Sequence, residues 1–178
     1  MNYINGLWTN AQGQEFHSLN PANQEKVWSG NESTQADVEN AIKAANNAFT
    51  TWRTLSIAER VEYLTRYRSL LERDKNSLAR TVSDETGKPR WECLTEIGAM
   101  IGKLQISINA FEERCDEKHS PLGDGCQSVT RFRPIGAMAV FGPFNLPLHL
   151  PNGHIIPALI AGNTIVFKPS EETPHSAQ

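Results

Sequence analysis

Two short apolar runs near the C-terminal end of the chain constrain its fold more than any other feature. The first run spans 135–141 and the second spans 164–167. Runs this short and this apolar are typical of buried strands. Between them we expect a loop over 142–151 and then a short helix that contains 155–161. A strand, a helix and a strand in this order predict a right-handed crossover within a parallel sheet, so the predicted fold class is α/β.

Four helices are predicted before this unit. The pairs Thr34 with Asp37 and Ser56 with Glu59 have the spacing of capping boxes and mark the first two helix starts. The second helix is expected to run to about residue 73. The third should stop near Gly87, because glycine suits the left-handed position after a helix. In the fourth, apolar residues recur every three or four positions, so one side should be buried: Leu94, Ile97, Ile101, Leu104, Ile108 and Phe111.

The remaining segments have sequence patterns typical of strands and turns. Residues 1–30 alternate short apolar pieces with turn formers, which predicts strands or extended arms. From residue 120 onwards, prolines and glycines are followed by alternating and β-branched residues over 128–133. This pattern predicts a β-hairpin between the fourth helix and the crossover unit.

Charge and composition exclude several classes of function. The 17 Lys and Arg residues against 20 Asp and Glu residues leave a net charge of -3, without a long basic block, which disfavours nucleic-acid binding. The N-terminus has no basic stretch before an apolar core, and no long apolar run follows, so we expect a cytoplasmic protein without a membrane anchor.

Metal and redox sites are also not predicted. Cys93, Cys115 and Cys126 are widely spaced and are interpreted as reduced structural thiols. His149 and His154 would point in different directions on a helix, so they do not form a metal pair.

The loops after the two predicted strands are the places to look for chemistry, because open parallel sheets bind ligands beyond the carboxyl ends of their strands. In the first loop, Asn145 lies among prolines, where its amide could stabilise an oxyanion. Capping of the following helix is an equally supported role for this residue. In the second loop, Lys168 and Glu171 could hold the hydroxyls of a ribose. Residue types alone favour the alternative, a surface lysine and a glutamate at a helix start.

Five sequence blocks in a fixed order give the chain a specific resemblance. They occur at residues 3–8, 85–89, 133–136, 141–147 and 162–171. Together they resemble the aldehyde dehydrogenase superfamily over essentially the whole chain. More narrowly, 87–107 and 149–161 resemble the succinylglutamate semialdehyde dehydrogenases, which belong to the succinyl-transfer route of arginine breakdown.

The resemblance implies an incomplete aldehyde dehydrogenase fold with three parts. Residues 1–117 would be the helical and extended lead-in of the cofactor domain. Residues 118–134 would start the β arm through which intact family members form homo-oligomers. Residues 135–178 would be the first β-α-β unit of a Rossmann-like, NAD-binding sheet, and the catalytic domain would be absent.

The resemblance also implies roles for individual residues in the oxidation of a small-molecule aldehyde, with NAD as cofactor and NADP not excluded. Asn145 matches the asparagine that stabilises the oxyanion. The cofactor would be contacted by residues of both loops: Phe141, Gly142, Pro143, Phe144, Lys168, Ser170 and Glu171. The substrate tunnel would be lined by residues of the crossover helix and the fourth helix: Leu146, His149, Gly153 and, opposite them, Met100.

The resemblance implies that three parts of the family's machinery come later in the family than the stretch that residues 1–178 match: the nucleophilic cysteine, the general-base glutamate and the glycine motif at the nicotinamide phosphates. We therefore expect this chain alone to be inactive. Two alternatives stay open. The chain could act as a non-catalytic module that pairs with another subunit through its arm, or it could represent another aldehyde dehydrogenase subfamily.

The first prediction concerns turnover. The 178-residue chain should not oxidise succinylglutamate semialdehyde, because it lacks a thiolate in the context that attacks the aldehyde. NADH formation followed by absorbance is the measurement. NADH formation that disappears when Cys93, Cys115 or Cys126 is replaced by serine would contradict the prediction.

Overall fold

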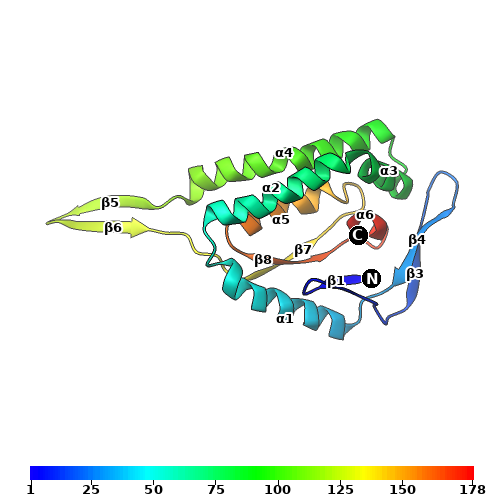
Figure 1. The fold of residues 1–178 in the computed structure, drawn as a ribbon, viewed down its shortest axis with the longest axis horizontal. Helices are drawn as coiled ribbons and strands as arrows, with labels where there is room; N and C mark the ends of the chain where they lie inside the picture. Colours follow the sequence, from blue (N-terminus) through cyan, green and yellow to red (C-terminus); the bar gives the residue numbers. More distant parts are fainter.

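The computed structural model describes residues 1–178 as β-hairpins, four long helices and one β-α-β unit (Figure 1). The N-terminal part contains β1 (Asn2–Ile4), β2 (Leu7–Thr9), β3 (Glu15–Leu19) and β4 (Lys26–Asn31). The long helices are α1 (Gln35–Trp52), α2 (Ile57–Arg73), α3 (Lys75–Thr86) and α4 (Arg90–Cys115). The C-terminal part contains β5 (Lys118–Gly123), β6 (Cys126–Thr130), β7 (Ala137–Phe141), α5 (His149–Ile160), β8 (Thr164–Lys168) and α6 (Pro174–Ala177).

Local capping explains where three of the long helices begin or end. Both predicted capping boxes are confirmed, with Thr34 and Ser56 each exchanging side-chain and backbone hydrogen bonds with the acid three residues later. The predicted end of α3 is also confirmed, since Gly87 adopts the left-handed conformation with a φ of 71°. A Cβ at this position would lie 2.8 Å from Cγ of Pro21, so both backbone conformation and space favour glycine.

The crossover unit is confirmed as parallel. β7 and β8 pair in register from Ala137 with Thr164 to Phe141 with Lys168. The Asn163 side chain fixes the start of β7, because its Oδ1 accepts hydrogen bonds from the backbone N–H groups of Ile135 (2.7 Å) and Gly136 (3.1 Å).

Two predicted boundaries are wrong. The loop expected over 142–151 ends earlier, because α5 begins at His149. The first turn of α5 obtains its hydrogen-bond acceptor from α4, which is distant along the chain, so the local sequence does not reveal this start. The strand expected over 128–133 ends at Thr130, because the partner strand begins at Lys118 and these two residues form the last pair of the ladder. The β5–β6 hairpin projects away from the body of the molecule (Figure 1).

The core lies around α4. One apolar cluster joins α2, α3 and α4, and a second joins α2, α4 and α5. The predicted stripe on α4 does face the core: Ile97 and Leu104 are buried cluster residues, and the other four are half-buried and pack against the two clusters. The buried face of α4 also includes residues outside the predicted stripe, which are Cys93, Glu96, Met100 and Ser107. Contact with several helices buries a wider face of α4 than the apolar stripe alone.

Two side chains join α1 to the crossover unit. Oγ1 of the buried Thr164 donates to the backbone oxygen of Ala45 at 2.9 Å. Nε1 of Trp52 donates to the backbone oxygen of Leu159 at 3.1 Å. These bonds place α1 beside β8 and the end of α5, as seen in Figure 1.

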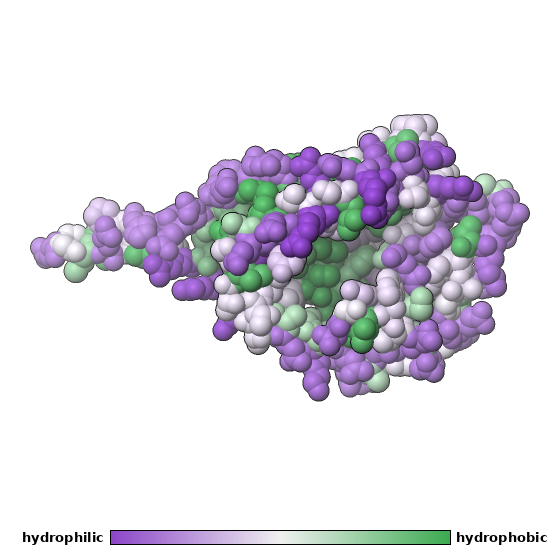
Figure 2. Space-filling view, in the orientation of Figure 1, coloured by the Kyte–Doolittle hydropathy of each residue, from purple (hydrophilic) through white to green (hydrophobic).

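The β7–β8 pair leaves apolar surface exposed. Both strands have one unpaired edge, since they form a sheet of two strands only. Ile135 is 96% exposed and Phe141 is 76% exposed. Figure 2 shows the face over this pair hollowed in its middle, with apolar residues on the floor. Such edges and patches favour association with further polypeptide.

The second prediction is that the 178-residue chain self-associates. Ile135→Lys should weaken association by about tenfold or more, because burying one large aliphatic side chain contributes about 1.5–3 kcal/mol. Sedimentation velocity over a range of concentrations is the measurement. Ile106→Lys, at a 60% exposed position on α4, is the matched control and should have little effect. A monodisperse monomer at all concentrations would refute the prediction.

Candidate active-site edge

The loops after β7 and β8 meet at one edge of the parallel pair. The backbone N–H of Gly142 donates to the carbonyl oxygen of Lys168 at 2.9 Å, one residue beyond the last strand pair. A Cβ on Gly142 would lie 2.9 Å from Cε2 of Phe167 and 3.1 Å from Cγ of Pro151, so this position has little room for a side chain. The structure therefore brings the 142–147 and 168–171 loops together, as parallel strands require.

Asn145 is exposed in the first loop, and its side chain makes no hydrogen bond within the chain. The N-cap of α5 is Leu148, without any side-chain cap from the same segment. Helix capping, the alternative role considered for Asn145, is therefore not what this geometry shows. Pro143 and Pro147 flank Asn145 and restrict the backbone of the loop. The arrangement presents a free amide on a constrained loop.

Lys168 and Glu171 form an ion pair at the end of β8. The Lys168 Nζ and Glu171 Oε2 atoms lie 2.7 Å apart, with side chains that are 59% and 71% exposed. The hydrogen bond from Lys168 lowers the pKa of the Glu171 carboxyl. Ser170 is buried, and its Oγ accepts from the backbone N–H of Glu172 at 3.2 Å. Ser170 thus shapes the turn, while the other two side chains face solvent.

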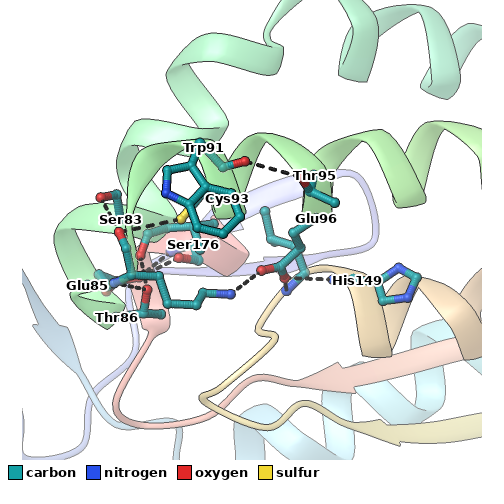
Figure 3. Close-up of polar contacts among 12 residues, drawn as sticks. Ser83, Glu85, Thr86, Trp91, Cys93, Thr95, Glu96, His149 and Ser176 are labelled. Atoms are coloured by element: carbon teal, nitrogen blue, oxygen red, sulfur yellow. Dashed lines mark hydrogen bonds and ion pairs between the residues drawn. The ribbon is translucent and has the colours of Figure 1, made fainter.

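A glutamate from α4 holds the first turn of α5. Oε1 of Glu96 accepts the backbone N–H groups of Leu148 and His149, each at 3.1 Å. Its Oε2 faces Nζ of Lys88 at 2.5 Å, and the two side chains are 1% and 15% exposed. Figure 3 shows Glu96 pointing from its helix toward His149.

Sequence reasoning missed both Glu96 and Lys88. One signal could have identified Glu96. It is an acid among Cys93, Ile97 and Met100, at spacings that share one helix face. A buried acid at such a position requires a partner.

The four expected tunnel residues lie around the α4–α5 contact. Leu146 and Gly153 are half-buried. His149 is also half-buried, and its Nδ1 is enclosed without a hydrogen-bond partner. The Met100 side chain is only 4% exposed and belongs to the core cluster against which Leu148 packs. Met100 does lie opposite α5, as expected, but its side chain serves as core.

A shallow cleft follows β7. Its volume is about 240 Å³ and its lining consists of Met138, Ala139, Val140, Phe141 and His154. Phe141 is the one expected site residue that lines it. The cleft therefore lies between β7 and α5 and reaches the edge of the parallel pair at Phe141.

The three cysteines lie on α4 and β6, outside the loops that follow β7 and β8. Cys93 is fully buried, and burial raises the pKa of its thiol, which keeps it protonated at neutral pH. Cys126 is exposed on the projecting hairpin. No group of three or more His, Cys, Asp or Glu side chains is placed to hold a metal ion.

Comparison with known proteins identifies the family. The profile of the aldehyde dehydrogenase family matches residues 8–178. The N-succinylglutamate 5-semialdehyde dehydrogenase of Acinetobacter baylyi is 49% identical over 176 residues, which are 99% of this chain and 36% of that protein. The protein of the same name from Escherichia coli is 52% identical over the same shares. The chain thus spans about a third of the length of these curated relatives.

Solved structures agree with the sequence match. An NADP-dependent glyceraldehyde-3-phosphate dehydrogenase from Bacillus halodurans, in complex with NADP, superposes with a TM-score of 0.90 at 27% identity, over 97% of this chain and 38% of that one. An NAD-dependent benzaldehyde dehydrogenase from Corynebacterium glutamicum superposes with a TM-score of 0.88 at 27% identity, over the same shares. The profile match covers nearly the whole chain, and the chain belongs to the aldehyde dehydrogenase family.

Proposed function

We propose that this chain is the N-terminal part of an NAD(P)-dependent aldehyde dehydrogenase that oxidises succinylglutamate semialdehyde to N-succinylglutamate. The observation that carries the proposal is the free amide of Asn145 at the edge where both strands of the parallel pair end. About half of the residues are identical to those of the curated succinylglutamate semialdehyde dehydrogenases, which supports this substrate over that of another subfamily.

Asn145 is proposed to stabilise the oxyanion. When a thiolate adds to an aldehyde carbonyl, an S–C bond forms, the C=O π bond breaks and the oxygen takes the negative charge. A donor already held in position stabilises that charge without reorganising during the reaction. The Asn145 side chain is exposed and unbonded, so its N–H groups are available to such an oxygen. The thiolate itself is not supplied by the described cysteines.

Lys168 and Glu171 are proposed to hold the ribose of the dinucleotide. An ammonium and a carboxylate suit vicinal hydroxyls, which both donate and accept hydrogen bonds. Their ion pair is exposed at the strand end, so the donor set fits the group. When bound, NAD(P) would supply the hydride acceptor. Phe141 and Phe144, 76% and 61% exposed, with Gly142 and Pro143 between them, would contact the cofactor. Ser170 would shape the ribose turn.

Leu146, His149 and Gly153 are proposed to line the passage of the aldehyde, with Met100 supporting it from the core. His149 is half-buried in the first turn of α5, where part of its imidazole would face the passage. The separation of the chain into 1–117, 118–134 and 135–178 is proposed as the division into lead-in, arm and cofactor sheet.

The β5–β6 hairpin is proposed to pair copies of the enzyme. It projects from the body (Figure 1), and only Ser128 among its strand residues is half-buried. The same feature favours the second candidate function, a non-catalytic module that joins another subunit. We also propose a cytoplasmic location. None of the helices has the length and apolar character needed to cross a membrane.

The third prediction tests Asn145 in an active enzyme in which this chain is continued by the C-terminal part of a family member. Asn145→Ala should lower the acylation rate by roughly a hundred- to a thousandfold, with cofactor affinity nearly unchanged. Burst-phase kinetics measure acylation, and fluorescence titration measures affinity. Asn145→Asp is the control, since its charge opposes the oxyanion. Near-normal turnover by the Asp variant would rule out the proposed role.

The fourth prediction tests the ribose site in the same enzyme. Lys168→Met should raise the Kd for the cofactor by about tenfold, because one charge-assisted hydrogen bond contributes about 1.5–3 kcal/mol. Acylation at saturating cofactor should stay unchanged. Lys103→Met, which removes a half-buried lysine of α4, is the control. An unchanged Kd would argue against a ribose contact.

A further inference from the structure

The first turn of α5 depends on a carboxylate from another helix. Leu148 occupies the N-cap without a side-chain hydrogen bond, and the first turn contains no acidic residue. The first N–H groups of a helix have no acceptor within the helix and need one elsewhere. Oε1 of Glu96 accepts two of them, at 3.1 Å each. The negative charge also lies at the positive end of the helix dipole, which favours this placement.

Glu96 is itself held by Lys88. The second carboxylate oxygen meets Nζ of Lys88 at 2.5 Å in a largely buried pair. The Lys88 backbone is fixed in turn, since its carbonyl accepts from Oγ of Ser83 at 2.7 Å and its N–H donates to Oγ1 of Thr86 at 3.3 Å. The Lys88 ammonium holds one oxygen of Glu96, and the two N–H groups of α5 hold the other. The carboxylate therefore has a defined position.

The loop that carries Asn145 is anchored at both ends. At its start, the Gly142 N–H is bonded to the Lys168 carbonyl at 2.9 Å. At its end, the Leu148 and His149 N–H groups are bonded to Glu96. Between these anchors, prolines limit the backbone, so a shift of either anchor moves Asn145 as well.

Stability alone does not explain a buried ion pair at this place. A buried pair is often no more stable than apolar residues of the same volume. An apolar side chain at 96 would continue the buried face formed by Cys93, Ile97 and Met100. It would, however, leave the first turn of α5 without an acceptor. The Glu96 carboxylate therefore serves to fix the position of the first turn of α5.

We propose that Glu96, held by Lys88, is a positioning residue that sets the Asn145 amide for oxyanion stabilisation. This inference rests on the proposed function of Asn145. Glu96 does not touch the reacting atoms and acts through the loop. The donor must lie about 2.7–3.1 Å from the oxyanion, and a misplacement of about 1 Å costs on the order of a hundredfold in rate.

The fifth prediction is a double-mutant cycle on Glu96 and Asn145 in the active enzyme that contains this chain. Glu96→Ala should lower the acylation rate at saturating cofactor by about ten- to a hundredfold. In the Asn145→Ala background the same change should cost little more, because the group through which Glu96 acts is already gone. If the rate losses of the two single variants multiply in the double variant, the positioning role of Glu96 is overturned while the role of Asn145 stays intact. Full activity of Asn145→Ala would instead refute the proposed function itself.

A matched control separates positioning from folding. Glu85→Ala removes a similarly buried carboxylate, 5% exposed against 4% for Glu96, which caps α6 instead of α5. Both variants should melt at lower temperature. Only Glu96→Ala should slow acylation per folded molecule and speed amide exchange at Leu148 and His149. Equal slowing of acylation in both variants would overturn the proposal.

A rescue experiment tests the role of Lys88. In Glu96→Gln, the amide oxygen can still accept the α5 N–H groups, but its NH2 then faces the Lys88 ammonium, another donor. Adding Lys88→Met removes this conflict. The double variant should therefore acylate several-fold faster than Glu96→Gln alone. A double variant slower than both single variants would contradict the positioning role of the pair.

Discussion

Parallel pairing of β7 with β8 is the constraint on which the candidate site depends. Parallel strands need a crossover, and α5 provides it within the same segment. Because both strands run in one direction, their carboxyl ends lie at one edge, where Gly142 bonds to Lys168. A proposed oxyanion donor and a proposed ribose site, far apart along the chain, thereby become neighbours. An antiparallel pair would have placed them at opposite ends.

Two buried carboxylates then attach this unit to the preceding helices. Glu96 of α4 accepts N–H groups at the start of α5, and Glu85 of α3 accepts the N–H groups of His175 and Ser176 at the start of α6. Glu85 also accepts from Oγ of Ser18 in β3 at 2.7 Å. Neither α5 nor α6 has a side-chain cap of its own. The preceding helices thus supply the acceptors that the starts of α5 and α6 lack.

Elements with local causes were predictable. The capping boxes at Thr34 and Ser56 and the left-handed Gly87 involve residues within a few positions of one another, so their chemistry is visible in a short window. The same holds for the apolar runs that became β7 and β8. The start of α5 was not predictable in this way. Its acceptor, Glu96, is 52 positions before Leu148 along the chain.

The sequence by itself determined the four long helices, the hairpin after them, the parallel crossover and the residue types of both loops, because these follow from local spacing and backbone chemistry. Only the tertiary structure decided which polar residues α4 buries, where α5 starts and that Asn145 is left unbonded. Those outcomes depend on hydrogen bonds and packing between segments distant along the chain. Glu96 shows the difference. The sequence presents an acid on an apolar helix face, and the fold supplies Lys88 and two backbone N–H groups as its partners.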